Sequence, residues 1–189
     1  MRIITGTARG RRLETLQGED TRPTAERVKE GLFSALQFEI EGRDVLDLFA
    51  GSGQLGLEAL SRGAASCVFV DKNVEAVEIV KRNLKQTGLQ ETGRVICQDA
   101  LGYLSYGSEQ FDIAFLDPPY DAGLLEPILP KLATRMRPGG VIACETNERV
   151  TLPDRVGDFA LARTYRYGKI YIWLYRYADT QSEEEASSL

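Results

Sequence analysis

The sequence predicts an α/β fold with a mostly parallel, seven-stranded sheet that ends in an antiparallel hairpin. From residue 44 to residue 145, apolar strand-like runs alternate with segments of helical periodicity, as in parallel strands joined by helices. Two β-rich runs, 159–165 and 169–175, then follow each other with three residues between them. No helix fits in that gap, so these runs are expected to pair antiparallel.

Each element follows from its local pattern. Residues 1–21 contain spaced glycines and arginines and are expected to form an arm or hairpin, and a helix over 22–38 starts with Pro23 or is capped by Thr24. The expected parallel strands are 44–49, 67–71, 94–98, 111–116 and 141–145, with helices over 54–62, 73–86 and 124–134. We expect one domain over 1–178, with its core over 44–177, and a disordered acidic tail over 179–189.

Composition excludes several kinds of chemistry. The 189 residues contain no histidine, which removes Ser-His-Asp catalysis, histidine-bearing zinc sites and the two-histidine iron site. The isolated Cys67, Cys97 and Cys144 are interpreted as reduced core thiols, and no metal is expected. No run has the length of a membrane span or the pattern of a secretory leader, so we expect a cytoplasmic protein without membrane contact.

Charge is distributed unevenly along the chain. The formal net charge is −5, yet Arg2, Arg9, Arg11 and Arg12 occur with no acid between Met1 and Leu13. A local basic patch binds phosphates whatever the net charge. We therefore expect the arm to contact nucleic acid, with a solvated edge hairpin as the alternative.

A glycine-rich loop follows the first strand. The segment from Gly51 through Gly53 to Gly56 matches G-x-G-x-x-G, and Asp71 ends the next strand 20 residues after Gly51, as in dinucleotide-binding domains. Asp47, however, places a carboxylate beside the turn where a dinucleotide would present its pyrophosphate. This charge disfavours a nicotinamide cofactor and favours S-adenosylmethionine, which carries an ammonium and no phosphate.

In that interpretation each strand end contacts one part of the cofactor. Asp47 holds the ammonium, backbone N–H groups of Gly51 to Gly53 meet the carboxylate, and Asp71 binds the ribose hydroxyls. Asp99 and Ala100 are placed to contact the adenine amine, and Phe49 and Lys72 complete the predicted set. Helix caps or turn residues are the plain alternatives for these aspartates.

The tetrapeptide Asp117-Pro118-Pro119-Tyr120 follows the apolar run 111–116, where open α/β sheets bind their ligands. The paired prolines stiffen the turn. The Asp117 carboxylate and the Pro118 carbonyl can accept both N–H bonds of an exocyclic base amine, and Tyr120 offers a stacking face. We expect these three residues to be catalytic by orientation; whether Asp117 also takes the proton stays open.

The chain resembles the bacterial 16S rRNA (guanine-N2)-methyltransferase family of the RsmD type. The match lies in residues 1–6, 21–24, 27–28, 46–53, 57–64, 69–71 and 115–120 and spans nearly the whole chain up to Tyr175. The resemblance implies a Rossmann-like class I methyltransferase fold and methyl transfer to the N2 amine of a specific guanine in 16S rRNA, in an assembled or late-precursor small subunit. It also implies that Arg22 and Thr24 border the acceptor pocket, with the arm on RNA. We expect a monomer.

Other interpretations remain open from the sequence. The rivals are an adenine-N6 or cytosine-N4 DNA methyltransferase, a nicotinamide-dependent reductase and a non-catalytic RNA-binding factor. A compact chain without an inserted recognition domain counts against the DNA enzyme. Glu58 and Arg62, four residues apart on a helix, are expected to form a surface pair, and Tyr171, Trp173 and Tyr175 are expected to pack in the sheet.

Overall fold

The structure is a computed structural model that describes residues 1–16, 23–119 and 123–178. Its helices are α1 (Pro23–Ala35), α2 (Gln54–Ser61), α3 (Val74–Thr87), α4 (Ala100–Ser105) and α5 (Leu125–Ala133). Its strands are β1 (Asp44–Asp47), β2 (Ser66–Asp71), β3 (Gly93–Cys97), β4 (Phe111–Leu116), β5 (Met136–Asn147), β6 (Arg155–Val156), β7 (Phe159–Tyr167) and β8 (Ile170–Tyr177).

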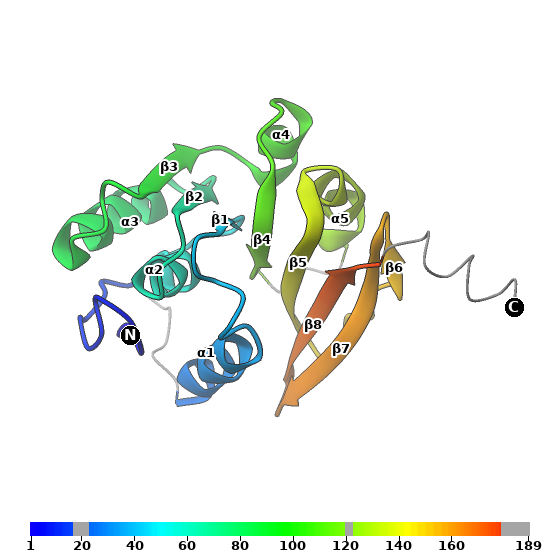
Figure 1. Cartoon of the computed structure of the whole chain (residues 1–189), viewed down its shortest axis with the longest axis horizontal. Helices are drawn as coiled ribbons and strands as arrows, with labels where there is room; N and C mark the ends of the chain where they lie inside the picture. The colour runs from blue at the N-terminus through cyan, green and yellow to red at the C-terminus, as the bar shows by residue number, and fades with distance from the viewer. Residues whose placement is uncertain (17–22, 120–122, 179–189) are drawn as a thin grey trace, which may run out of the picture.

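The strands form one sheet in the order β3-β2-β1-β4-β5-β8-β7-β6 (Figure 1). The first five pair parallel, and β8 pairs antiparallel with both β5 and β7. The predicted fold class is confirmed. The sheet gains an eighth strand because the two residues of β6 pair with the start of β7, a ladder too short to leave a periodic signal.

Helices cover both faces of the sheet (Figure 1). One core cluster joins Phe33 of α1, Leu57 of α2 and Val80 of α3 to inward side chains of the strands. The second joins Tyr103 of α4 and Leu129 of α5 to the opposite side chains. Every residue of β4 is buried, as expected of a central parallel strand.

Local chemistry explains the helix boundaries. Helix α1 starts at Pro23, so of the two predicted starts the proline at the first helical position is the one found. Helix α3 is capped by Asn73, whose side chain accepts the Glu75 N–H at 2.9 Å, and it ends at Gly88 with a φ of 76°. The short helix α4, which the sequence did not predict, is capped by Asp99.

The first residues form the predicted hairpin, with an antiparallel bridge between Arg2 and Arg12. It is not a solvated edge, because Ile3, Ala8 and Leu13 are buried in the first core cluster. Within the described ranges, no helix is long and apolar enough to cross a membrane.

Candidate active site

The carboxyl ends of β1, β2, β3 and β4 surround a cavity of about 440 Å³. Seven predicted cofactor residues line it: Asp47, Phe49, Gly51, Asp71, Lys72, Asp99 and Ala100. Asp117 and Pro119 from the end of β4 also line it. The structure therefore brings seven of the eight predicted cofactor residues and Asp117 of the predicted acceptor turn to one cavity. Parallel strands produce this arrangement because their carboxyl ends lie at the same edge of the sheet.

Asp47 is 1% exposed and lies beneath the glycine loop. Its Oδ2 accepts the N–H of Gly56 at 2.9 Å, which is one of the unpaired N–H groups in the first turn of α2. Burial raises the pKa of Asp47 to about 7; the Gly56 hydrogen bond opposes this rise and the charge of Asp71 adds to it. The carboxylate thus occupies the helix N-terminus that a pyrophosphate would use in a dinucleotide site.

Asp71 holds the glycine loop to β2. Its Oδ2 accepts the Gly51 N–H at 2.8 Å, and its Oδ1 accepts the Asn73 N–H at 2.8 Å. The Gly53 N–H donates to the Ala50 carbonyl at 2.6 Å. Two of the N–H groups that were expected to meet a ligand carboxylate are therefore already bonded within the protein, one to Asp71 of β2 and one to Ala50.

Gly53 and Gly56 are each explained by a local structural requirement for glycine. Gly53 has a φ of 78°, a left-handed conformation that favours glycine, and it is not among the cavity-lining residues. A Cβ on Gly56 would lie 2.3 Å from the Phe69 ring, so this glycine permits close contact between α2 and β2. Neither reason depends on a phosphate.

Gln54 is a lining residue that the sequence analysis missed. Its Oε1 is the single buried side-chain polar atom within the described ranges that lacks a hydrogen-bond partner. A buried acceptor without a partner is costly, and here it borders the cavity beside Asp47. The pair suits a positively charged ligand that carries N–H groups. Its position directly after Gly53 of the glycine loop could have identified it as a candidate from the sequence.

Asp99 both borders the cavity and caps α4. Its Oδ1 accepts the Gly102 N–H at 2.8 Å, so the plain capping role is real, and the side chain is exposed. The neighbouring Cys97 is exposed, which corrects the interpretation of all three cysteines as core thiols. Cys97 ends β3, whereas Cys67 and Cys144 lie in the middle of buried strands.

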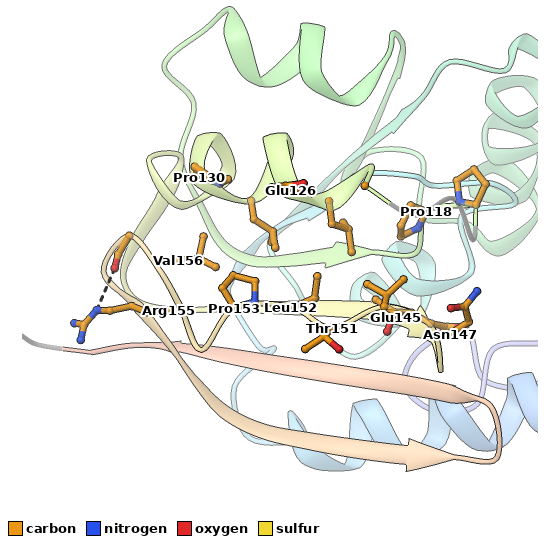
Figure 2. A pocket seen from close by; sticks show the side chains of 17 residues that line it. Pro118, Glu126, Pro130, Glu145, Asn147, Thr151, Leu152, Pro153, Arg155 and Val156 are labelled. Atoms are coloured by element: carbon orange, nitrogen blue, oxygen red, sulfur yellow. Dashed lines mark hydrogen bonds between the residues drawn. The ribbon is translucent and has the colours of Figure 1, made fainter.

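The acceptor turn separates two cavities. Asp117 lines the first cavity, Pro118 lines a second one of about 630 Å³, and Pro119 lines both. Figure 2 shows this second cavity, with Glu126 and Pro130 coming from α5 and Glu145 and Asn147 from the end of β5. Thr151, Leu152, Pro153, Arg155 and Val156 also line it. The rigid turn is therefore a shared wall.

The N-terminal arm is anchored by Glu58, and the prediction of a surface Glu58–Arg62 pair is wrong. Glu58 is 0% exposed and accepts the N–H groups of Ile4 at 2.8 Å and Thr5 at 3.0 Å as well as Arg62 Nε at 2.8 Å. The spacing along the helix was right, but the arm covers this face of α2. Lys29 Nζ lies 3.7 Å from Glu58 and donates to the Arg2 carbonyl at 2.7 Å.

The predicted RNA-binding arginines lie on the outside of this anchored arm. Arg2, Arg9, Arg11 and Arg12 are all exposed. Arg2 and Arg12 border a further cavity of about 470 Å³ together with Glu26, which forms an ion pair of 3.7 Å with Arg2. The same arm reaches the cofactor cavity, because Leu16 lines it.

Three predicted site residues cannot be placed in full. Tyr120 and Arg22 lie outside the described residues, and Thr24 is placed in α1 without a described side chain. Within the described part of the chain, no group of three His, Cys, Asp or Glu residues is arranged to hold a metal ion.

The chain is similar to several known proteins along most of its length. Residues 1–176 match the protein family described as Conserved hypothetical protein 95. The Ribosomal RNA small subunit methyltransferase D of Haemophilus influenzae is 40% identical over 153 residues, covering 78% of this chain and 79% of that protein. The protein of the same name in Escherichia coli is 34% identical over 188 residues, covering 98% and 94%.

Solved structures show the same architecture. A hypothetical protein of Thermus thermophilus superposes with a TM-score of 0.77 at 31% identity, covering 92% of this chain and 98% of that one. The T. thermophilus 16S rRNA N2 G1207 methyltransferase, solved with AdoMet and guanosine, superposes at 0.72 with 24% identity, covering 86% and 45%. The expected class I methyltransferase fold is confirmed. The chain belongs to the Conserved hypothetical protein 95 family, that of the small-subunit ribosomal RNA methyltransferases D.

Proposed function

We propose that this protein transfers a methyl group from S-adenosylmethionine to the exocyclic N2 amine of a specific guanine in the 16S rRNA of the small ribosomal subunit. The observation that carries the proposal is the common cavity of Asp47, Asp71 and Asp117. This cavity supports a cofactor subsite and a base-amine subsite within one site. In this proposal residues 1–178 act as a single methyltransferase domain whose arm contacts the RNA.

The cofactor assignment rests on charge. Bound S-adenosylmethionine supplies an electrophilic methyl group on a sulfonium. The carboxylate of Asp47 and the Oε1 of Gln54 suit its ammonium, whereas both would repel the pyrophosphate of a nicotinamide dinucleotide. Asp71 keeps contact with the cavity and suits ribose hydroxyls; Asp99 and Ala100 suit the adenine. Phe49 and Lys72 complete this wall.

The acceptor chemistry rests on the rigid turn. A base amine is a poor nucleophile because its lone pair is delocalised into the ring. The Asp117 carboxylate and the Pro118 carbonyl would accept its two N–H bonds and turn the lone pair toward the methyl group, with Tyr120 stacking on the base. Methyl transfer from a sulfonium disperses charge, so a water-poor site and fixed dipoles favour it.

The choice of RNA and of guanine rests on the relatives. The Haemophilus and Escherichia proteins are named as small-subunit rRNA methyltransferases, and the 24%-identical Thermus enzyme is an N2-guanine methyltransferase solved with guanosine. The exposed Arg2, Arg9, Arg11 and Arg12 suit RNA phosphates. Arg22 and Thr24 are proposed to border the acceptor pocket.

Methyl transfer can be tested directly. The protein is incubated with methyl-labelled S-adenosylmethionine and one of three acceptors: small ribosomal subunits lacking the modification, protein-free 16S rRNA or duplex DNA. We expect label in the subunit rRNA and N2-methylguanosine after nucleoside digestion. Label on DNA alone, or on another nucleoside, would refute the proposal. Tight binding of NAD in place of S-adenosylmethionine in isothermal titration would equally refute it.

Two variants separate the subsites. We expect Asp117→Ala to lower kcat about 10²- to 10³-fold with little change in cofactor affinity, because it removes an interaction made with the acceptor. Asp99→Ala should instead raise the KM for S-adenosylmethionine. Unchanged turnover in Asp117→Ala would show that the acceptor turn has been assigned wrongly.

A further inference from the structure

The β7–β8 hairpin is a second basic and aromatic segment. Residues 159–178 contain four Arg or Lys and no acid, together with five of the eight tyrosines and the one tryptophan of the chain. The predicted packing role holds for Tyr175, which is 0% exposed and donates its hydroxyl to the Pro153 carbonyl at 2.7 Å. Trp173 also packs against the second core cluster, as predicted, but it and Tyr171 both stay partly exposed.

Three side chains form an ordered strip on one face of this hairpin. Arg166 lies directly opposite Tyr171, and Thr164 opposite Trp173, so these side chains share a face. The Tyr171 and Trp173 rings are stacked with centroids 6.5 Å apart and planes at 29°, and the Arg166 guanidinium lies 5.6 Å from the Tyr171 centroid. Trp173 is fixed by its Nε1, which donates to Thr146 Oγ1 at 2.8 Å.

This strip adjoins the proposed acceptor site. Thr146 lines the second cavity, and Pro118 and Pro119 of the acceptor turn line that cavity as well. The turn between β7 and β8 lies beside Asn147, at the carboxyl end of β5, where β5 pairs with Ile170. The cavity in Figure 2 therefore connects the acceptor turn to the residue that holds Trp173.

The opposite face of the hairpin offers a natural comparison. Arg163 lies 5.2 Å from the Tyr165 ring, and these two residues are opposite Leu174 and Ile172, which belong to the core cluster beneath α1. An arginine beside a tyrosine ring therefore occurs on both faces of the hairpin. The Arg166 face is the one that continues into the cavity beside the acceptor turn.

We propose that Arg166, Tyr171 and Trp173 form a stacking surface for single-stranded RNA bases that flank the target nucleotide. The identity of the RNA rests on the proposed function. Aromatic rings that lie along an open sheet face stack unpaired bases, and arginine adds a further planar face. The side chain of Lys169 at the hairpin turn is 85% exposed, and its solvent-exposed ion pair with Glu148, at 4.0 Å, leaves its charge accessible to the phosphates. Duplex RNA buries the faces of its bases, so the surface selects unpaired strands.

Trp173 itself reports on this surface, since it is the one tryptophan of the chain. Titration with a short single-stranded oligoribonucleotide should quench the protein fluorescence saturably, and a duplex of equal length should quench it far less. We expect Arg166→Gln combined with Tyr171→Leu to weaken single-strand binding about tenfold. Tyr171→Phe keeps the ring and should bind almost like the native protein.

Arg163→Gln is the matched control, because it removes the same charge from the other face of the same hairpin. Thermal unfolding first establishes that every variant is folded. Equal weakening by Arg163→Gln and Arg166→Gln would overturn the proposal, because net charge alone would then explain binding. Absence of quenching by the single strand would overturn it as well.

The stacking surface and the methyltransferase reaction can be refuted independently of each other. With small subunits as substrate, loss of the strip should raise the KM for RNA and leave kcat and the affinity for S-adenosylmethionine unchanged. Unchanged KM in a folded variant removes the stacking surface but leaves the methyltransferase in place. Single-strand quenching without methyl transfer by the native protein supports the surface and removes the proposed reaction.

Discussion

Asn83 of α3 is bonded to the Ser52 carbonyl of the glycine loop through its Nδ2, at 2.9 Å. The same nitrogen donates to the Glu14 carbonyl at 3.0 Å, and Oδ1 accepts the Glu14 N–H at 2.8 Å. Asn83 is 0% exposed. One buried amide therefore joins the arginine-bearing arm to the loop that borders the cofactor cavity.

Replacement of Asn83 should affect both partners. Asn83→Leu keeps a similar volume but removes the Asn83 partner of the Ser52 carbonyl in a buried bond, and loss of the partner of a buried group costs about 1–3 kcal/mol. It also removes both part-buried bonds to the backbone of Glu14. We expect a lower free energy of unfolding in urea and a higher Kd for S-adenosylmethionine by calorimetry. Gln86→Ala is the control, because Gln86 bonds the arm at the Arg12 carbonyl. An unchanged cofactor Kd in a folded Asn83→Leu would contradict this link.

Glu58→Gln tests the anchor of the arm. The substitution removes a buried charge that faces Arg62 and Lys29, and breaking a buried pair costs about 3–5 kcal/mol. We expect a lower urea midpoint and faster proteolysis within residues 1–16. Glu78→Gln, at an exposed pair with Lys81, should leave both unchanged. Equal stability of the two variants would mean that Glu58 does not hold the arm.

Asp47 should make ligand-free stability depend on pH. Its pKa is raised from 3.8 to about 7 in the folded protein, so the folded state binds more protons than the unfolded state across that interval. Its contribution to stability therefore falls as pH rises from about 4 to about 7, by at most about 1.4 kcal/mol per pH unit. The Asp47→Asn variant has no carboxyl to titrate. The difference between its free energy of unfolding and that of the native protein should therefore increase from about pH 4 to about pH 7 and stay constant above that.

The same carboxyl predicts a proton release. An ammonium placed beside Asp47 favours the carboxylate, so binding of S-adenosylmethionine near pH 7 should expel a proton. Calorimetry in buffers of different ionisation enthalpy measures this directly. Binding heats that do not vary with the buffer would argue against contact between the ammonium and Asp47.

Cys97 offers a test of the cavity that does not need activity. Its thiol is exposed and lies 3.9 Å from the carbonyl of Lys72, a cavity residue. Burial raises the pKa of the Cys67 and Cys144 thiols, so a thiol reagent should modify Cys97 alone. S-adenosylhomocysteine should slow that modification, as followed by mass spectrometry. Equal rates with and without the ligand would argue against binding beside Lys72.

Most of the fold could be predicted because its signals are local. Alternating apolar runs identify strands, and the short gap at 166–168 identifies the antiparallel hairpin. The two-residue β6 and the six-residue α4 were missed because neither is long enough to show a recognisable hydrophobic pattern. The loops between these elements contain glycines with positive φ, a backbone conformation that glycine adopts without steric cost.

The site could be predicted only where position along a strand decides it. Asp47 and Asp71 are the last residues of their strands, Asp99 and Asp117 come just after theirs, and parallel strands bring those ends together. Glu58 was misjudged because its burial depends on Ile4 and Thr5, more than 50 residues away. Gln54 was missed because an acceptor without a partner is recognised only once every neighbouring group has a position.

Helix α2 has no solvent-exposed face on which substitutions would be tolerated. Residues 55–61 are all buried: Gly56 contacts β2 too closely for a methyl group, and Glu58 and Ser61 bind the arm. Its first turn, at Gly56, is bonded to Asp47 beneath the cofactor cavity. In a saturation mutagenesis experiment, these few residues should therefore tolerate fewer substitutions than the longer, half-exposed α3. The proposed methyl transfer would then be sensitive to substitutions in a helix that itself carries none of the proposed catalytic groups.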